Sequence, residues 1–315
     1  MAHVRRRVRI GDRRRHIKRP HLFSPYGVAV SPSTARPAPP PPEPLAPLVD
    51  AHTHLDACGA HDSDGVREIV ERAAAVGVRA VVTIADDLAS ARWVTRAAGW
   101  DPRVYAAVGL HPTRADSLDA PACAEIEALA AQPRVVAIGE TGLDWYWPGR
   151  LEGCAEPAAQ RAAFAWHIDL AKRTGKPLMI HNRDADAGVL DVLRAEGAPD
   201  TVIFHCFSSG PAMARTCVDA GWVLSLAGTV SFKNAAELRE AARLIPPGQL
   251  MVETDAPFLT PHPYRGAPNE PYCLPYTVRA LADATGRSAE DLACDLTATA
   301  ARVYGLSRSN LIQPR

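Results

Sequence analysis

Residues 134–181 read RVVAIGETGLDWYWPGRLEGCAEPAAQRAAFAWHIDLAKRTGKPLMIH, and their pattern predicts one complete strand–helix–strand unit. The short apolar runs at 134–139 and 177–181 predict buried strands. Between them, apolar residues recur at the helical period: Phe164, Ile168 and Ala171. The predicted helix ends at Gly175, just before a proline. Continuous apolar strands joined by a helix are typical of a parallel sheet that is buried on both faces.

The same alternation of strand and helix runs through the chain from residue 47 onward. Further strands are predicted at 47–51, 79–84, 103–109, 201–205, 222–226 and 249–254. Eight such units in about 265 residues predict an α/β fold, a (β/α)8 TIM barrel that forms a single domain over residues 48–310. The alternative is an open doubly wound sheet. That fold would need a glycine-rich phosphate loop, and neither G-x-G-x-x-G nor a Walker motif occurs.

Residues 1–47 differ in composition from the rest of the chain. Residues 1–20 hold eight Arg and Lys18 against a single acidic residue, and a proline-rich stretch follows from Pro32 to Pro47. This composition buries too little apolar surface to offset the entropy of ordering, so the segment is predicted to be disordered. It is interpreted as a basic arm that contacts nucleic acid, as a solvated tail, or as the product of a wrongly chosen start codon.

The overall charge balance conceals an asymmetry between the extension and the barrel. Lys+Arg and Asp+Glu both total 35, but residues 1–49 hold ten of the basic and two of the acidic residues, which leaves a net charge of −8 on residues 50–315. Bulk charge on the barrel will therefore not attract nucleic acid, and metal ions with a local basic patch would have to.

Seven cysteines without a C-x-x-C pair argue against a disulfide framework or a thiolate zinc site, and they favour a reducing compartment. No apolar run is long enough for a membrane span, and the basic N-terminus lacks the apolar core of a secretory signal. We therefore expect a cytoplasmic protein without a membrane association, and the sequence indicates no obligate protein partner.

Polar side chains gather at the predicted C-terminal ends of six strands, which is where barrel enzymes carry their reactive groups. The set consists of five histidines and two carboxylates: His52, His54, His111, Glu140, His181, His205 and Asp255. The H-x-H spacing places His52 and His54 on the same face, because side chains alternate along a strand. Imidazoles and carboxylates converging on one mouth would be costly without a cation between them, so these residues predict a metal site.

Six ligands exceed what one catalytic zinc takes, and two ions that share a bridging carboxylate account for them better. We expect His52, His54 and Asp255 on one ion, and His181 and His205 on the other, with Glu140 bridging. A water between the ions would be the nucleophile, and Asp255 is placed to accept its proton as ligand, base or both. Imidazole-rich sites suit Zn²⁺ or Mn²⁺.

Seven segments of the sequence resemble the TatD family of metal-dependent hydrolases, within the amidohydrolase-like barrels. They are DAHTHLD at 50–56, GLHP at 109–112, AIGETGLD at 137–144, IHNRDA at 180–185, HCFS at 205–208, ETDAP at 253–257 and RGAPNEP at 265–271. The resemblance covers about residues 48–306. It implies a two-metal site with the ligands given above. It also implies metal-dependent phosphodiester hydrolysis of DNA, often from the 3′ end, with Mg²⁺ or a similar ion.

Three positions depart from the family pattern without removing a ligand. Thr113 follows the His-Pro pair where family members often carry a His or another polar group. Ser208-Ser209-Gly210 replaces the usual Ser-Gly, and Thr299 stands where the C-terminal helix usually shows an Asn. These departures bear on substrate preference and rate.

Substrate contacts are predicted from the remaining polar residues of the motifs. His111 is surplus to the ligand set, and it either contacts a phosphate or fixes the rim through a hydrogen bond. Arg183 and Arg265 suit phosphate because a guanidinium matches its oxygens, although Arg265 could instead pair with Glu270. Glu253 is expected to orient a ligand. The Trp145-Tyr146-Trp147 cluster could stack on a base, but core or lid packing is the preferred interpretation.

Two rival functions are open. One is hydrolysis of an amide, lactone or phosphotriester, as in the wider barrel superfamily, where many members bridge their metals with a carbamylated lysine at the fourth strand. Glu140 occupies that place here and no lysine is nearby. The other is a non-catalytic nucleic-acid-binding protein that relies on its Arg-rich arm, and the intact ligand set argues against it.

Overall fold

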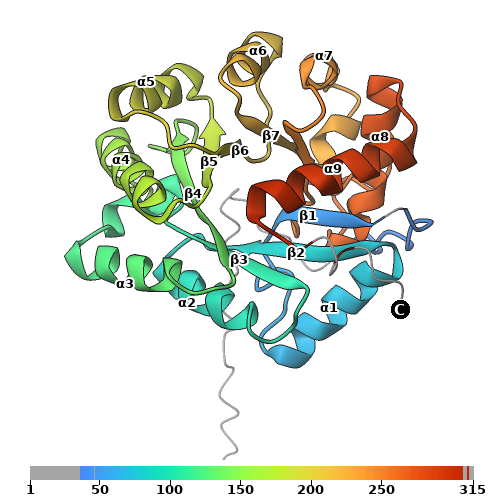
Figure 1. Cartoon of the computed structure of the whole chain (residues 1–315), viewed down its shortest axis with the longest axis horizontal. Helices are drawn as coiled ribbons and strands as arrows, with labels where there is room; N and C mark the ends of the chain where they lie inside the picture. Colours follow the sequence, from blue (N-terminus) through green and yellow to red (C-terminus); the bar gives the residue numbers. More distant parts are fainter. Residues whose placement is uncertain (1–35, 46, 308–310, 312–315) are drawn as a thin grey trace, which may run out of the picture.

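The computed structural model describes residues 36–45, 47–307 and 311, and it forms an eight-stranded parallel barrel surrounded by helices (Figure 1). The strands are β1 (Leu48–Thr53), β2 (Val78–Ile84), β3 (Val104–Val108), β4 (Val135–Asp144), β5 (Leu178–Arg183), β6 (Val202–Phe204), β7 (Val223–Leu226) and β8 (Leu250–Val252). They pair in chain order from β1 to β8, and every pair is parallel. The predicted TIM barrel and all eight predicted strands are confirmed.

The barrel closes between β1 and the segment that follows β8. Asp255 N donates to His52 O at 3.0 Å, and His54 N donates to Ala256 O at 2.8 Å. Asp50 adds a buried side-chain connection, since its two oxygens accept from the backbone N–H of Thr254 at 2.9 Å and from its hydroxyl at 2.6 Å. The closure therefore fixes the two segments that carry His52, His54 and Asp255 against each other.

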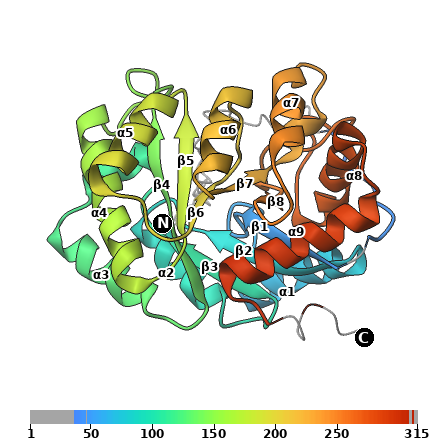
Figure 2. The same ribbon diagram turned by 45° about the horizontal axis from the view of Figure 1, so that its top comes forward.

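The described part of the chain has nine α-helices and three 3₁₀-helices. Figure 2 shows the α-helices arranged around the strands. The helices are α1 (Ser63–Ala75), α2 (Leu88–Ala97), η1 (Pro112–Ser117), α3 (Ala120–Ala130), α4 (Pro157–Thr174), α5 (Asp186–Glu196), α6 (Pro211–Asp219), η2 (Gly228–Ser231), α7 (Ala236–Leu244), η3 (Pro271–Cys273), α8 (Leu274–Thr285) and α9 (Ala289–Tyr304). None of the helices in residues 36–45, 47–307 and 311 is long and apolar enough to cross a membrane.

The hydrophobic core has an inner and an outer part because side chains alternate along each strand. On β2, Val82 lies in the cluster inside the barrel and Val81 lies in the cluster between the sheet and the helices. Ala300 and Tyr304 of α9 join the inner cluster, and the Tyr304 hydroxyl donates to Ala51 O at 2.9 Å. Apolar side chains, including those of α9, thus fill the barrel interior below the C-terminal ends of the strands.

Strand β4 is longer than predicted, because Gly139 and Gly142 let it remain paired with β5 beyond residue 139. Gly142 has φ +138°, and a Cβ at this position would lie 2.1 Å from His181 O. Only glycine tolerates both the conformation and this close approach. Pairing therefore continues to Asp144, opposite Arg183, and brings the end of β4 next to His181.

The predicted disorder of residues 1–47 is wrong for residues 36–45, which lie against the barrel. Pro39 and Pro42 are buried, and carbonyls of the segment accept hydrogen bonds from η3 and α8. Disorder was predicted from the low apolar content of this segment. The side chains of Tyr272 and Tyr276 supply the contacts that order it. Residues 1–35 lie outside the described part of the chain.

His167 in α4 is a buried neutral imidazole, and it should make stability depend on pH. Its Nε2 accepts from Leu110 N at 3.2 Å and its Nδ1 donates to Ala163 O at 2.7 Å, so both nitrogens are occupied without a second proton. Burial lowers the pKa of His167 from 6.5 to about 4. Its stabilising contribution is therefore complete above pH 6.5 and is lost as the pH falls toward 4.

We expect the free energy of unfolding to fall by about 2–3 kcal/mol between pH 7 and pH 4.5 through His167 alone. Urea unfolding at both pH values, on wild type and on the His167→Gln variant, would measure this contribution. The variant should lose less stability on acidification by that amount. Equal losses in the two proteins would contradict the assignment.

Candidate metal centre

The six predicted ligands lie together at the C-terminal end of the barrel, and all of them are buried. The first group joins the end of β1 to the segment after β8. Nε2 of His52 and Nε2 of His54 lie 3.2 Å apart, and Asp255 Oδ1 lies 3.5 Å from the first and 3.6 Å from the second. These three atoms are close enough to bind one ion.

The second group joins the ends of β4, β5 and β6. His181 Nδ1 lies 3.3 Å from His205 Nε2. Glu140 Oε2 lies 3.5 Å from that nitrogen of His181 and 2.5 Å from that of His205. This group therefore offers two imidazole nitrogens and one carboxylate oxygen to a second ion.

The Glu140 carboxylate extends from one group to the other. While Oε2 faces the second group, Oε1 lies 3.8 Å from His54 Nε2 and 4.0 Å from His52 Nε2. One oxygen is thus directed at each set of imidazoles, which is the placement that a bridging carboxylate needs.

Each of the four imidazoles directs its other nitrogen to a separate partner. His181 Nε2 lies 3.0 Å from Asp144 Oδ2, and His205 Nδ1 lies 3.4 Å from Glu253 Oε1. His54 Nδ1 lies 3.9 Å from Asp86 Oδ1, and His52 Nδ1 lies 3.2 Å from the sulfur of Met179. Such partners fix the orientation of a metal-binding imidazole and the position of its proton.

The sequence interpretation included Glu253 but missed Asp86 and Asp144. Asp86 follows β2 in an Asp-Asp pair, and an acidic residue before a helix is most simply explained as a cap, the role that the neighbouring Asp87 takes. Asp144 belongs to the GLD motif, but the predicted strand ended at residue 139. Its position at the end of the extended β4 became visible only with the β4–β5 pairing.

The facing nitrogens show that the site suits cations. Carboxylates lie on the far side of three rings and can each hold a proton on the outer nitrogen, which would leave the inner nitrogen of the neutral ring to bind a cation. Two lone pairs 3.3 Å apart, on His181 and His205, repel each other unless a positive charge lies between them. Neutral imidazole nitrogens and carboxylate oxygens are ligands of divalent transition metals. The residues present therefore fit a metal ion in each group.

The electrostatics of the site also favour positive charge. Burial alone would lower the pKa of His54, but the carboxylates of Asp86, Asp255 and Glu140 raise it to about 10. Burial likewise disfavours ionised Glu140, yet the neighbouring imidazoles, with His205 first, hold its pKa well below the usual range. The mouth thus retains anionic carboxylates that attract cations.

Asp255 is held in a conformation that is uncommon for its residue type. Its φ is +51°, in the left-handed region, and its backbone N–H is fixed by the bond to His52 O. The preceding Thr254 is fixed by Asp50. This strain, of about 1 kcal/mol or more, is maintained by the surrounding bonds and directs the Asp255 carboxylate at the imidazoles.

The residues predicted to contact the substrate lie at different depths within the C-terminal end of the barrel. His111 is buried, with its ring centroid 4.3 Å from that of His181, and its Nδ1 accepts from Thr113 N at 3.2 Å. Arg183 is half-buried, with its guanidinium 4.0 Å from the centroid of the Tyr146 ring. His111 and Arg183 thus adjoin the second group of ligands through His181 and β5.

Arg265 lies farther out, exposed on the loop after β8, with its guanidinium 4.4 Å from the centroid of the Phe232 ring. Arg265 and Glu270 do not form the alternative ion pair in the structure, and Glu270 instead accepts from Arg72 at 2.8 Å. In the Trp145-Tyr146-Trp147 cluster, Trp147 is buried.

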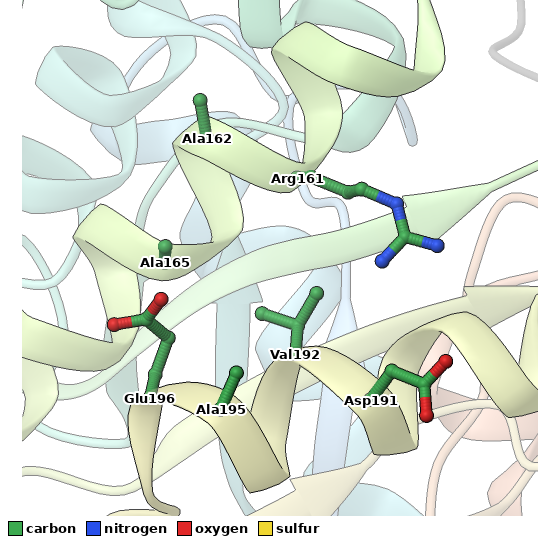
Figure 3. Close-up of a pocket in the computed structure, with 7 residues that line it drawn as sticks. All are labelled: Arg161, Ala162, Ala165, Asp191, Val192, Ala195 and Glu196. Atoms are coloured by element: carbon green, nitrogen blue, oxygen red, sulfur yellow. The ribbon is translucent and has the colours of Figure 1, made fainter.

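A cavity of about 380 Å³ lies elsewhere, on the outside of the barrel between α4 and α5 (Figure 3). Its charged lining residues are Arg161, Asp191 and Glu196, which project from the two helices. It contains none of the strand-end residues, so its size does not make it the reaction site.

Replacing Asp144 by Asn should weaken metal binding about 10- to 100-fold, because the charge that orients His181 is lost while the shape is kept. Titration of metal-depleted protein with Mn²⁺ would measure this change. Asp119→Asn, at the N-terminus of α3, is the matched control and should bind as wild type does, since Asn also caps a helix. Unchanged metal affinity in Asp144→Asn would show that Asp144 does not contribute to metal binding.

Comparison with known proteins identifies the family to which the chain is similar. Residues 49–305 match the family model described as TatD related DNase. The chain is 75% identical over 259 residues to the uncharacterized metal-dependent hydrolase TatD of Mycobacterium tuberculosis (strain ATCC 25618 / H37Rv), an alignment that covers 82% of this chain and 98% of that protein.

Two further relatives extend the comparison. The chain is 33% identical over 247 residues to the 3′-5′ ssDNA/RNA exonuclease TatD of Klebsiella pneumoniae (strain 342), which covers 76% of this chain and 91% of that protein. Among solved structures, YJJV, a TatD homolog from Escherichia coli K12, superposes with a TM-score of 0.75 at 25% identity, covering 82% of this chain and 98% of the other.

Proposed function

This chain belongs to the TatD-related DNase family of metal-dependent hydrolases, and on that premise we propose that it removes nucleotides from the 3′ end of single-stranded DNA. The proposed reaction is hydrolysis of a phosphodiester bond with two divalent metal ions. The observation that carries the proposal is the position of Glu140, with one carboxylate oxygen directed at each group of imidazoles. The exonuclease activity of the Klebsiella relative supports the choice of substrate.

Each group of ligands would hold one ion. His52, His54 and Asp255 form the first set, His181 and His205 form the second, and Glu140 is shared. Divalent ions bound here supply electrostatic stabilisation of the phosphate and lower the pKa of a bound water. Mg²⁺, Mn²⁺ and Zn²⁺ are the candidates, because imidazole-rich sites suit Mn²⁺ or Zn²⁺ and the family resemblance points to Mg²⁺.

The side chains of this protein would accept a proton from the attacking water and bind the phosphate. The carboxylate of Asp255 accepts the proton of the attacking water. Its Oδ1 lies 3.5 Å from Nε2 of His52 and 3.6 Å from Nε2 of His54. His111 remains neutral, since burial and then His181 lower its pKa to about 3. Because its Nδ1 is an acceptor for Thr113 N, its proton is on Nε2, where it can donate to a phosphate oxygen.

The guanidinium of Arg183 is the second group that we assign to the phosphate. It lies at the end of β5, two residues beyond His181 along the strand, and it is packed on Tyr146. A packed guanidinium loses less entropy when it binds a phosphate than a mobile side chain does. Arg265, which is exposed on the rim, would contact the DNA farther from the reacting bond.

The residues at the C-terminal end of β4 argue against the rival assignment to amide, lactone or phosphotriester hydrolysis. Within residues 36–45, 47–307 and 311 the lysines are Lys172, Lys176 and Lys233, and none lies at the C-terminal end of β4. The position from which a carbamylated lysine would bridge the metals is taken by Glu140.

The test is digestion of a 5′-labelled single-stranded oligonucleotide by metal-depleted protein supplemented with Mg²⁺, Mn²⁺ or Zn²⁺. We expect progressive shortening from the 3′ end, which a chelator stops and a 3′-phosphorothioate linkage slows. Cleavage of amide or lactone substrates with none of DNA would establish the rival hydrolase. DNA binding without turnover under every metal would establish the non-catalytic binding protein.

A further inference from the structure

The loop between β4 and α4 places a second arginine, Arg150, beside Arg183 at the end of β5. The guanidinium carbon of Arg150 lies 4.7 Å from the centroid of the Tyr146 ring, and that of Arg183 lies 4.0 Å from the same centroid. Arg150 also donates from Nη1 to the backbone oxygen of Tyr146. Two guanidinium groups therefore share one aromatic ring, and the reaction described above uses only one of them.

The loop that carries Arg150 is held by a side chain that also contacts a metal ligand. Asp144 Oδ1 accepts from the backbone N–H of Tyr146 at 2.9 Å and from that of Trp147 at 3.0 Å, while Asp144 Oδ2 lies 3.0 Å from Nε2 of His181. The backbone N–H of Arg150 donates to Trp147 O at 2.8 Å, and Trp147 is buried. One carboxylate and one turn therefore connect Arg150 to the second group of ligands.

The two arginines extend from the ligands toward solvent. Arg183 lies two residues beyond His181 on β5, and side chains alternate along a strand, so both point to the same side of the sheet. Arg183 is half-buried, whereas Arg150 is exposed. The pair therefore leads from beside His181 to the surface of the rim.

The charge of Arg150 is available to a ligand. Arg150 forms no ion pair with a carboxylate of residues 36–45, 47–307 and 311. Its guanidinium lies instead against the ring that also contacts Arg183, and two like charges held this close repel each other. An anion that contacts both groups would remove this cost.

Phosphate is the anion that suits the pair. A guanidinium stacked on an aromatic ring keeps its N–H edge free for bidentate contact with phosphate oxygens, and little freedom is lost on binding because the side chain is already positioned. Residues 50–315 carry a net charge of −8, so a polyanion has to be attracted by local groups of cations. Arg150 and Arg183 form such a group beside the metal ligands.

The position of the reacting bond determines which phosphate Arg150 can bind. When the 3′-terminal nucleotide is removed, the reacting phosphate is the last one of the strand, and the nucleotide beyond it ends in a hydroxyl. The neighbouring phosphate therefore lies on the 5′ side. We propose that Arg150 binds this phosphate, one nucleotide upstream of the reacting bond, while Arg183 binds the reacting phosphate. The inference rests on the proposed function, since it takes the 3′ end of a DNA strand as the substrate.

The experiment compares three short substrates that differ in their second phosphate. A dinucleotide has only the reacting phosphate, a trinucleotide has both, and a trinucleotide with a methylphosphonate at its 5′ linkage has the added nucleotide without the added charge. Full-length wild type, Arg150→Gln and Arg150→Lys are loaded with Mn²⁺, and kcat and KM are measured for release of the 3′-terminal nucleotide.

Arg194→Gln is the matched control, because it removes the same charge from an exposed arginine at the other end of the barrel. Arg194 lies in the last turn of α5, which leads back to the N-terminal end of β6, and it pairs with Asp191 at 2.9 Å. Thermal unfolding of every variant shows whether the fold is retained. Arg150 is exposed, so we expect each midpoint to stay close to that of wild type.

We expect Arg150→Gln to raise KM for the trinucleotide about tenfold, with a much smaller change in kcat, because one charge-assisted contact to phosphate is lost. The increase should be at least about five times smaller for the dinucleotide and for the methylphosphonate, which lack the second charge. Arg150→Lys should recover part of the affinity, since lysine keeps the charge without the planar fork. Arg194→Gln should match wild type with all three substrates.

Equal increases with the three substrates would overturn the proposal, because they would not depend on the second phosphate. An effect of Arg194→Gln as large as that of Arg150→Gln would overturn it as well, since it would reflect net charge alone.

Failure to cleave any substrate with any metal would refute the proposed function, and binding then tests Arg150 separately. Fluorescence anisotropy with a 5′-labelled single-stranded oligonucleotide gives Kd over a range of salt concentrations. Loss of one phosphate contact should make the salt dependence shallower by about 0.7 in Arg150→Gln than in Arg194→Gln. Equal slopes would show that Arg150 does not bind a phosphate.

Discussion

The Glu140→Gln variant is expected to lose at least about 10³-fold in kcat/KM for single-stranded DNA. The reason is the loss of a carboxylate whose oxygens face both groups of imidazoles. Metal ions contribute several kcal/mol to transition-state stabilisation, and each 1.36 kcal/mol corresponds to about a tenfold change in rate. Gln preserves the size of the side chain, so the change tests the charge and the bridging position together.

Metal content should fall in parallel with activity in this variant. Wild type and Glu140→Gln would be loaded with Mn²⁺, separated from free metal and measured by elemental analysis, with Glu127→Gln on the surface as the matched control. We expect fewer ions per chain in Glu140→Gln and an unchanged number in the control. Full activity with full metal content would rule out the bridging assignment.

The Asp255→Asn variant should lose kcat by about 10²- to 10⁴-fold, the range for removal of a positioned general base. Asn keeps an oxygen at the same place but cannot accept the proton of the attacking water. The second group, with His181, His205 and Glu140, is untouched and should retain its ion. The readouts are kcat from oligonucleotide digestion and the stoichiometry of bound Mn²⁺.

The pattern of losses separates the two roles of Asp255. A large fall in kcat that persists when excess Mn²⁺ restores both ions, with KM unchanged, supports a proton acceptor. If the variant instead regains full activity at high metal concentration, Asp255 acts only as a ligand. Asp62→Asn, at the N-terminus of α1, serves as the control and should match wild type in both measurements, because Asn also caps a helix.

The barrel followed from the sequence because its determinants are local. Each strand is a short apolar run, and each helix shows its own period, as in residues 134–181. Parallel strands joined by helices have few topologies, and the reactive ends then coincide. The positions of His52, Glu140, His181 and Asp255 at strand ends could be predicted without knowledge of any contact.

Other features depended on contacts between distant segments. The extension of β4 to Asp144 required Gly142 to pass within van der Waals contact of β5, which apolar periodicity does not report. The order of residues 36–45 required Tyr272 and Tyr276, which lie more than 230 residues away in the chain. Composition describes a segment by itself and cannot include the surface that it binds.

The sequence by itself determined the barrel, the order of its strands and the set of imidazoles and carboxylates at its mouth, since hydrophobic period and strand ends are properties of neighbouring residues. Only the tertiary structure decided which nitrogen of each imidazole faces the centre, that Asp86 and Asp144 lie at the outer nitrogens of His54 and His181, and that Arg36 lies beside Arg265. These depend on side-chain direction and distances of a few ångströms between remote segments, which are fixed only when the barrel closes.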